Sequence, residues 1–184
     1  MPNGEQGDIA DSYKVCEMLS IRYYAINIAD AVKGLEDQLK AFMPVSEDTL
    51  INIPPRIRMT TLYAIAQSLP NGGRVINTCN RSENYVGYST KFGDAAGDFS
   101  VLGNFLVSEV LAIGDELGLP KELVHKTPSD GLCGKTDEDN LGFTYTVLDA
   151  YLTGEKIDEE TMDAIERKHK ANLHKEKPMP AVTK

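Results

Sequence analysis

Residues 74–99 read RVINTCNRSENYVGYSTKFGDAAGDF and contain the pattern on which the fold prediction rests. The short run Arg74–Thr78 predicts a buried strand that ends in a hydroxyl side chain, and a helix is expected to begin near Asn80. A loop broken by glycines follows and contains Lys91 and Asp98. Backbone amides at a helix N-terminus attract anions, and glycines let a backbone approach a ligand closely. The stretch therefore predicts a polyphosphate or nucleotide site of unspecified kind.

Outward from this stretch, strands and helices are expected to alternate along the chain. Ile21–Ile28 (IRYYAINI) is β-branched and aromatic and predicts a second strand. Pro54 and Pro55 are expected in the first turn of a helix, where a missing amide hydrogen is tolerated. Apolar spacing predicts helices from Asp8 to about Leu19, over Ala29–Phe42, from Pro54 to about Leu69, over Leu106–Leu117, over Glu138–Tyr151 and over Asp158–His169, with a loop at Pro44–Leu50.

This alternation favours an α/β fold in which helices cover both faces of a parallel sheet and ligands bind at the carboxyl ends of the strands. Two strands are few for such a sheet, which usually has four or more. One or two βα units ahead of Met1 are therefore expected in the middle of the sheet. Residues 1–184 are expected to form a single domain.

Composition disfavours several classes of protein. The net charge of -9 and the pI near 4.8 argue against nucleic acid as a partner, because phosphate backbones normally need a clustered basic face. The three cysteines include no Cys-x-x-Cys pair, so neither a disulfide framework nor a zinc site is expected. The chain contains no run of about 18 apolar residues, so no membrane span is expected. A cytoplasmic protein fits these features best.

The residue types by themselves leave the roles of the polar side chains open. Asn80 and Glu83 have the spacing of a capping box, which is the simpler alternative to metal binding. Lys91 and Asp98 also fit a solvated loop pair, which would contribute little stability. The polar side chains Arg56 and Arg58 also fit exposed charges on a helix, and His125–Asp139 also fits a turn followed by a helix cap. Cys133 has no evident base partner, so nucleophilic catalysis is not expected.

Three long segments, in this order and at this spacing, resemble the signature blocks of bacterial ammonia-dependent NAD⁺ synthetases. They are NIPPRIRM at 52–59, NTCNRSENYVGYSTKFGDAAGDFS at 77–100 and LVHKTPSDGLCGKTDEDNLGFTY at 123–145. MPNGEQGDIADSYKV at 1–15 also resembles the segment that follows the family's second strand. Several blocks in register are far more specific than one glycine-rich motif.

The resemblance implies an adenine nucleotide α-hydrolase-like (Rossmann-like) fold and a homodimer. It also implies an ATP-dependent carbon-nitrogen ligase with magnesium as cofactor. Such an enzyme adenylates the carboxylate of deamido-NAD (nicotinic acid adenine dinucleotide), and ammonia then displaces AMP to give NAD⁺. A carboxylate is a poor acyl donor until its oxygen becomes part of a phosphate leaving group, and positive charge must stabilise the departing pyrophosphate.

Position by position, the resemblance also implies roles for individual side chains. Arg56, Lys91, Asp98, His174 and Lys175 resemble the residues that bind deamido-NAD, Thr78 and Ser129 resemble ATP contacts, and Glu83 resembles a magnesium ligand. Given the resemblance, we expect magnesium binding at Glu83 rather than capping alone.

Two departures from the family pattern concern the phosphate site. The family's Ser-Gly-Gly-x-Asp-Ser loop lies upstream of the segment that matches Met1, and the 184 residues contain no such sequence. Val107 stands where many members carry a lysine. We therefore expect these residues alone to have impaired activity. The alternative is a noncatalytic dinucleotide-binding or dimerisation module, or an inactive remnant. A tRNA-modifying enzyme with a related fold would conflict with the acidic pI and with the specific blocks.

Overall fold

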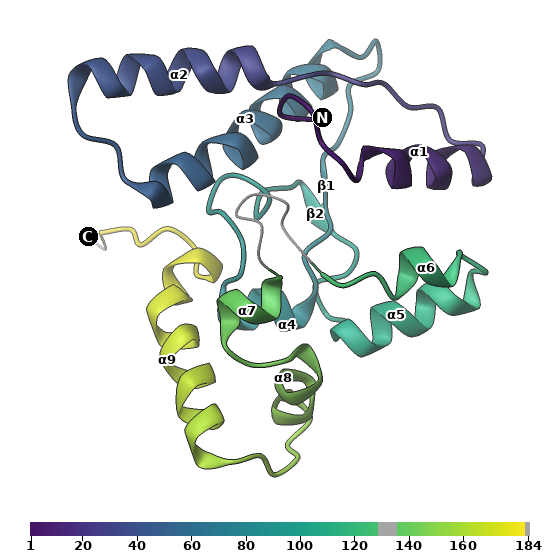
Figure 1. The fold of residues 1–184 in the computed structure, drawn as a ribbon, viewed down its shortest axis with the longest axis vertical. Coiled ribbons are helices and arrows are strands. Elements are labelled where there is room, and N and C mark those ends of the chain that lie inside the picture. The colour runs from purple at the N-terminus through teal and green to yellow at the C-terminus, as the bar shows by residue number, and fades with distance from the viewer. Residues whose placement is uncertain (129–135, 183–184) are drawn as a thin grey trace.

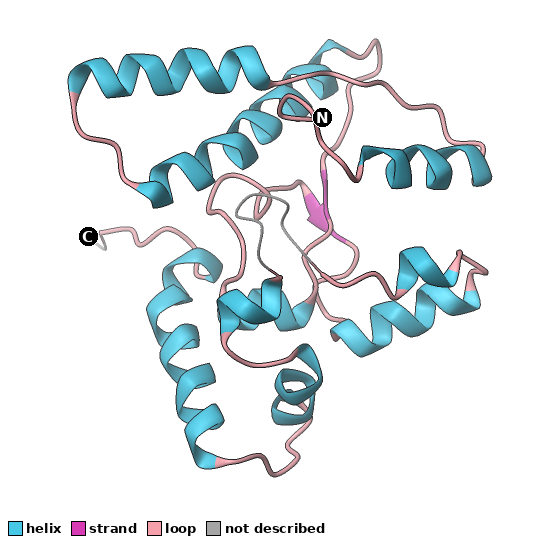
Figure 2. Ribbon diagram, in the orientation of Figure 1, coloured by secondary structure: helices cyan, strands magenta, loops and turns pink. Residues whose placement is uncertain are grey.

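The computed structural model describes residues 1–128 and 136–182, and its helices surround a small central sheet (Figures 1 and 2). In these views α2 and α3 lie above the strands, α1 lies to their right, and α4, α5 and α7 to α9 lie below them. The elements are α1 (Ile9–Met18), α2 (Ala29–Phe42), α3 (Glu47–Ser68), β1 (Ile76–Asn77), α4 (Arg81–Val86), β2 (Phe99–Ser100), α5 (Val107–Glu116), α6 (Lys121–Val124), α7 (Asp137–Leu141), α8 (Tyr145–Leu152) and α9 (Glu159–Glu176).

The sheet consists of β1 and β2, which pair in parallel with Ile76 opposite Phe99. Two further bonds extend the pairing, because the Asp98 amide donates to the Val75 carbonyl and the Val75 amide donates to Asp98 Oδ2, both at 2.7 Å. The predicted strand Arg74–Thr78 is thus confirmed over its central residues. The parallel direction of the pair also agrees with the α/β prediction.

The prediction of a strand at Ile21–Ile28 is wrong. The segment is irregular, and its backbone amides donate to other backbone atoms only at its ends, from Ile21 to Cys16 O and from Ile28 to Pro2 O, within the described part of the chain. Tyr24 remains 75% exposed. β-propensity reflects packing against neighbouring strands, so a sequence that favours a strand forms one only where a partner strand lies beside it.

Helix α3 begins earlier than predicted. Ser46 caps it by accepting a hydrogen bond from the Thr49 amide, so the expected loop Pro44–Leu50 is helical from Glu47 onward. Pro54 and Pro55 consequently lie inside the helix and not in its first turn. Both prolines are buried, so packing of this face compensates for the two amide hydrogen bonds that proline cannot make.

The remaining helices agree with the predictions except in their lengths. Helix α2 matches its predicted bounds, and α5 lies within one residue of them at each end. The helix expected at Glu138–Tyr151 is two helices, because Gly142 ends α7 at a φ of 84° and Thr144 caps α8. Helix α9 continues past His169 to Glu176. Neither α6 nor β2 was predicted.

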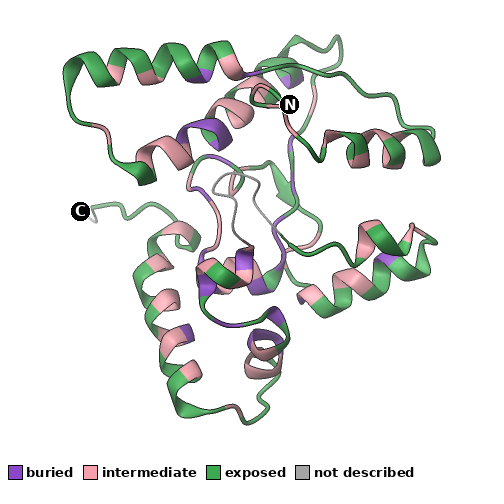
Figure 3. Ribbon diagram, in the orientation of Figure 1, coloured by how far each residue is buried: buried purple, intermediate pink, exposed green. Residues whose placement is uncertain are grey.

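Two apolar clusters form the core (Figure 3). The larger one joins α4, α7, α8 and α9 and consists of Val86, Leu141, Phe143, Tyr145, Leu148 and Ile165. The smaller one joins α2 to α3 through Ile28, Val32 and Ile53. The first cluster fixes α4 against α9, and both helices contribute residues to the site described below.

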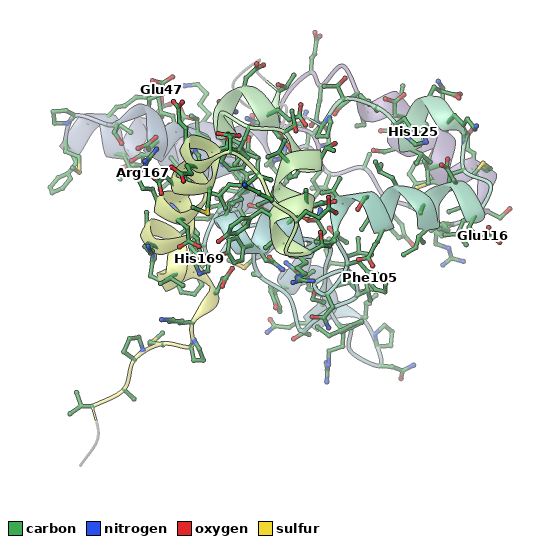
Figure 4. All side chains as sticks on the ribbon, turned by 90° about the horizontal axis from the view of Figure 1, so that it is seen from below. Glu47, Phe105, Glu116, His125, Arg167 and His169 are labelled. Carbon is green, nitrogen blue, oxygen red and sulfur yellow. The ribbon has the colours of Figure 1, made fainter. Side chains whose placement is uncertain are left out.

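Helix α9 packs against the C-terminal end of α4. His169 projects from α9 (Figure 4), and its ring stacks on Tyr85 with 4.0 Å between the ring centroids. Asn172 Nδ2 donates to the Val86 carbonyl at 3.1 Å. The next residue, Gly87, has a φ of 64°, and a Cβ atom there would lie 2.3 Å from Asn172 Cβ. Only glycine permits this close approach of the two helices.

We therefore expect Gly87→Ala to destabilise the protein more than Gly118→Ala. Both glycines have positive φ, which costs about 1–2 kcal/mol for other residues. A Cβ at Gly118 meets no atom within 4 Å, whereas the one at Gly87 collides with Asn172 and adds about 1–3 kcal/mol of overpacking. Urea unfolding of both variants measures the difference. Equal losses of stability would contradict the proposed close contact.

Candidate functional site

A cavity of about 540 Å³ lies between α3, β1, the loop after α4 and the end of α9. Its polar lining includes Arg58, Thr78, Thr90, Asp94 and Lys175. Its apolar lining includes Ile51, Pro55, Met59, Leu62, Val75 and Ile76. Ligand pockets commonly have this size and combine an apolar wall with a few polar groups.

Three of the five residues predicted to bind deamido-NAD are connected by hydrogen bonds, and a fourth, Lys175, is the chain neighbour of His174. Arg56 Nε donates to the Lys91 carbonyl at 3.3 Å, and Lys91 Nζ donates to the His174 carbonyl at 2.6 Å. Lys175 follows, and its Nζ donates to the Gly87 and Ser89 carbonyls at 2.7 and 2.9 Å. The fold thus gathers cationic side chains from α3, the loop after α4 and α9 at one place.

The surroundings of Lys175 differ from those of an exposed lysine. Burial lowers the pKa of its ammonium group, and the nearby charge of Asp94 opposes that shift only in part. Lys91 is also only partly exposed, and its Nζ lies 5.3 Å from the centre of the Phe92 ring. The cluster therefore offers two partly buried ammonium groups to an anion.

Asp98, the fifth predicted deamido-NAD residue, has a different place. Its Oδ2 accepts from the Val75 amide, so the carboxylate joins β2 to β1 and is not hydrogen-bonded to the other four residues. Thr78 follows β1 directly and lines the cavity, in agreement with the expected position at the carboxyl end of a strand. Ser129 lies outside the described residues.

Glu83 forms the capping box at the start of α4. Its Oε2 accepts from the Asn80 amide, and Asn80 Oδ1 accepts from the Glu83 amide, both at 2.9 Å. Burial raises the pKa of the Glu83 carboxyl to about 6, and the negative charges of Asp137 and Asp94 act in the same direction. A cation would relieve this concentration of negative charge.

The fit of Glu83 to magnesium is that of one ligand in an incomplete set. The part of the chain that the structure describes contains no group of three His, Cys, Asp or Glu side chains placed to hold a metal ion. Magnesium usually keeps several waters and binds through one or two carboxylates together with substrate phosphates. A single carboxylate is compatible with this mode of magnesium binding. The contacts of Glu83 are equally compatible with a role in capping alone.

A buried network that the sequence did not predict holds α4 beside α5. Ser82 is fully buried and donates to Asp149 Oδ1 at 2.5 Å. Asp149 Oδ2 accepts from the Ser108 amide at 2.8 Å, and Ser82 Oγ accepts from the Val107 amide at 3.2 Å. Leu106 at the N-cap has no side-chain acceptor. Ser82 and Asp149 therefore accept the hydrogen bonds of the first amides of α5 in its place. No local signal connects Asp149 to residues so distant in sequence.

Other residues of the cavity also escaped sequence reasoning. Arg58, expected as an exposed charge, is half-buried in the cavity wall. Asn52 accepts a hydrogen bond from Thr90 Oγ1 at 2.7 Å and so joins α3 to the glycine-containing loop. Both Asn52 and Arg58 lie in the NIPPRIRM block, and that block was the available signal.

The profile of the NAD synthase family matches residues 1–179. The chain belongs to that family. An NH(3)-dependent NAD(+) synthetase of Pyrococcus furiosus is 42% identical over 153 residues, which are 83% of this chain and 58% of the relative. One of Carboxydothermus hydrogenoformans is 36% identical over 173 residues, or 92% of this chain and 70% of the relative. The chain thus spans less than two thirds of the length of the Pyrococcus relative.

Solved structures of NAD synthase relatives share the fold. An NMN synthetase from Francisella tularensis is 35% identical with a TM-score of 0.91, and the match covers 98% of this chain and 74% of that one. An NH3-dependent NAD synthetase from Campylobacter jejuni is 26% identical with a TM-score of 0.76, and the match covers 100% and 76%. The adenine nucleotide α-hydrolase-like α/β fold is therefore confirmed. Among the described helices, none has the length and apolar character needed to cross a membrane.

The burial of Cys79 leads to a prediction about the reactivity of its thiol. Cys79 is buried directly after Thr78, and burial raises the pKa of its thiol to about 11. At pH 8 about one thousandth of this thiol is thiolate, the reactive form. In a Cys133→Ser background we expect a disulfide reagent to modify the partly exposed Cys16 at least about 10-fold faster than Cys79.

The rate of Cys79 modification should also rise about tenfold per pH unit between pH 7 and 10. Cys16→Ser should remove the fast phase, and urea should make both thiols react alike. A fast phase that survives Cys16→Ser would show that Cys79 is accessible.

Proposed function

We propose that this chain serves the ATP-dependent amidation of deamido-NAD by ammonia, through an adenylated intermediate, to give NAD⁺. The observation that supports this most strongly is the network of Arg56, Lys91 and His174 next to Lys175, which lines the cavity. These residues come from three distant parts of the sequence. The relatives named NH(3)-dependent NAD(+) synthetases give the network its chemical context.

The chain's residues would bind and orient the two substrates. Arg56, Lys91, His174 and Lys175 would hold the anionic dinucleotide, because cationic and polar donors complement its phosphates and its nicotinate carboxylate. Asp98, directly before β2, is proposed to bind the same dinucleotide. Thr78 and Ser129 would contact ATP. These contacts would place the α-phosphate of ATP in line with the substrate carboxylate that attacks it.

Magnesium, when bound, would offset negative charge on the departing pyrophosphate, and Glu83 is the residue proposed to hold it. Val107 offers no side-chain cation at the start of α5, and its amide is already bonded to Ser82 Oγ. We place the reaction in the cytoplasm, where three cysteines without a disulfide pattern are stable as thiols.

A second candidate is amidation of a mononucleotide. The NMN synthetase of Francisella tularensis has a TM-score of 0.91, against 0.76 for the Campylobacter jejuni NAD synthetase. The acid substrate would then be nicotinic acid mononucleotide, and the adenylation chemistry would be unchanged. Both acids therefore belong in the activity assay, and the ratio of their kcat/KM values decides between the candidates.

We expect weak AMP release when the 184 residues are assayed with ATP, magnesium, ammonia and either acid. Loss of one preorganised donor at an oxyanion site typically costs about 100- to 1,000-fold in rate, and these residues contain no Ser-Gly-Gly-x-Asp-Ser loop. Adding that segment from a relative, in cis or as a separate chain, should raise turnover. Rapid AMP release by the 184 residues alone would disprove the expected impairment.

In the extended chain, Glu83→Gln should abolish AMP release if Glu83 binds magnesium. Glu109→Gln is the matched control, because Glu109 Oε2 caps α5 in the same way, by accepting from the Leu106 amide at 2.8 Å. Magnesium should raise the melting temperature of the control but not of the Glu83 variant. Full activity in Glu83→Gln would leave Glu83 with the capping role alone.

Calorimetry separates the proposed function from the alternatives. A noncatalytic module would bind deamido-NAD without releasing AMP in the extended chain. An inactive remnant would neither bind nor react at millimolar ligand. Binding together with AMP release would support the synthetase. The acid that reacts faster would then be the substrate, and its amide would be the product.

We also propose a homodimer that pairs through α3. Leu62 and Ile65 on this helix and Leu69 at its C-cap are 40%, 37% and 50% exposed, and an apolar surface of this kind favours a partner. Light scattering at micromolar concentration should give twice the 20.2 kDa chain mass. Ile65→Glu should shift the protein to monomer, whereas Leu117→Glu, an exposed position at the end of α5, should not. A monomer for the unchanged chain would exclude the dimer.

A further inference from the structure

Arg58 lies on α3 beside the cavity, two residues after the exposed Arg56 but in different surroundings. Its side chain is half-buried, and Nε donates to the Met1 carbonyl at 2.9 Å. Within residues 1–128 and 136–182 this is the one hydrogen bond that its guanidinium group donates, and the group forms no ion pair there. The two terminal nitrogens, with four of the five N–H groups, thus have no acceptor among those residues.

This arrangement is unusual for a half-buried charge. Burial lowers the pKa of the guanidinium group, whereas the carboxylates of Asp8 and Asp94 favour the charged form from a distance without contacting it. Buried charges are normally paired and hydrogen-bonded, because the loss of hydration is otherwise uncompensated. Arg74 shows the ordinary case, since it is exposed and lies outside the cavity lining. Arg58 is therefore a cation with free donors on the wall of a cavity.

The cavity indicates which anion Arg58 would meet. It is also lined by Thr78, the proposed ATP contact, and by Lys175, a proposed deamido-NAD contact. The apolar residues of its wall suit a base or a sugar, and the cations suit a phosphate. A guanidinium fork matches a phosphate with two parallel hydrogen bonds, which an ammonium group cannot do.

We propose that Arg58 binds a phosphate group of a nucleotide held in this cavity. The proposal rests on the proposed function and adds a binding residue to it. A purely structural role would require only Nε, which anchors the Met1 carbonyl. The phosphate could belong to ATP, to deamido-NAD or to released pyrophosphate, and the three sources are distinguished by measurement.

The test is calorimetric titration of the 184-residue chain with inorganic pyrophosphate, with ATP and magnesium, and with deamido-NAD. Arg58→Lys keeps the charge and loses the fork, Arg58→Gln loses both, and Arg74→Gln is the control. We expect Kd for at least one probe to rise about 10-fold in the first variant and about 100-fold in the second, as for loss of a charged hydrogen-bonded pair. The salt dependence of Kd should also flatten in Arg58→Gln. The probe that is weakened identifies the source of the phosphate.

Thermal unfolding without ligand separates binding from structure. If Arg58→Gln fails to fold, Arg58→Lys decides by itself, because it retains a donor for the Met1 carbonyl. Unchanged affinity and salt dependence in folded variants would overturn the proposal, even with a lower Tm. So would the absence of binding of all three probes to the unchanged chain. Weakened pyrophosphate binding without any deamido-NAD binding would support Arg58 and contradict the proposed amidation.

Discussion

The rest of the structure depends on the hydrogen bonds that pair the free backbone groups at the two ends of α4. Arg81–Val86 is a helix of six residues, too short to be stable without tertiary contacts. At its start, the capping box of Asn80 and Glu83 is joined by the bond from Ser82 to Asp149 on α8. At its end, α9 supplies donors for the carbonyls that the helix leaves open. Helices far apart in sequence are thus anchored on one short element.

This constraint couples stability to the proposed chemistry. Glu83 is at once a cap and the proposed magnesium ligand, and Lys175 is at once a donor to the Gly87 carbonyl and a proposed contact of the dinucleotide. An anion that binds Lys175 competes with the carbonyls that now hold its ammonium group. Gly87 makes the arrangement possible, because any side chain there would force α9 away.

The site was predictable in composition but only partly in geometry. The capping box was recognised from spacing, because it lies within four consecutive residues. The resemblance named Lys91, His174 and Lys175. In the structure Lys91 Nζ donates to the His174 carbonyl, and Lys175 Nζ donates to the Gly87 carbonyl. Asp98 could not be placed in this way, since its bond to the Val75 amide depends on which strand lies beside it. Whether these side chains bind deamido-NAD stays a prediction.

Two local features could be predicted from the sequence, the cap at Asn80 and the bounds of α2, because caps and turns involve only neighbouring residues. Three other features depend on contacts between distant parts of the chain. Ile21–Ile28 has the composition of a strand, but strand formation needs hydrogen bonds from another segment. Pro54 lies inside α3 because its buried face packs in the core. Arg58 looked like a surface charge, yet desolvation depends on the atoms that fold around a side chain, and those come from distant parts of the chain.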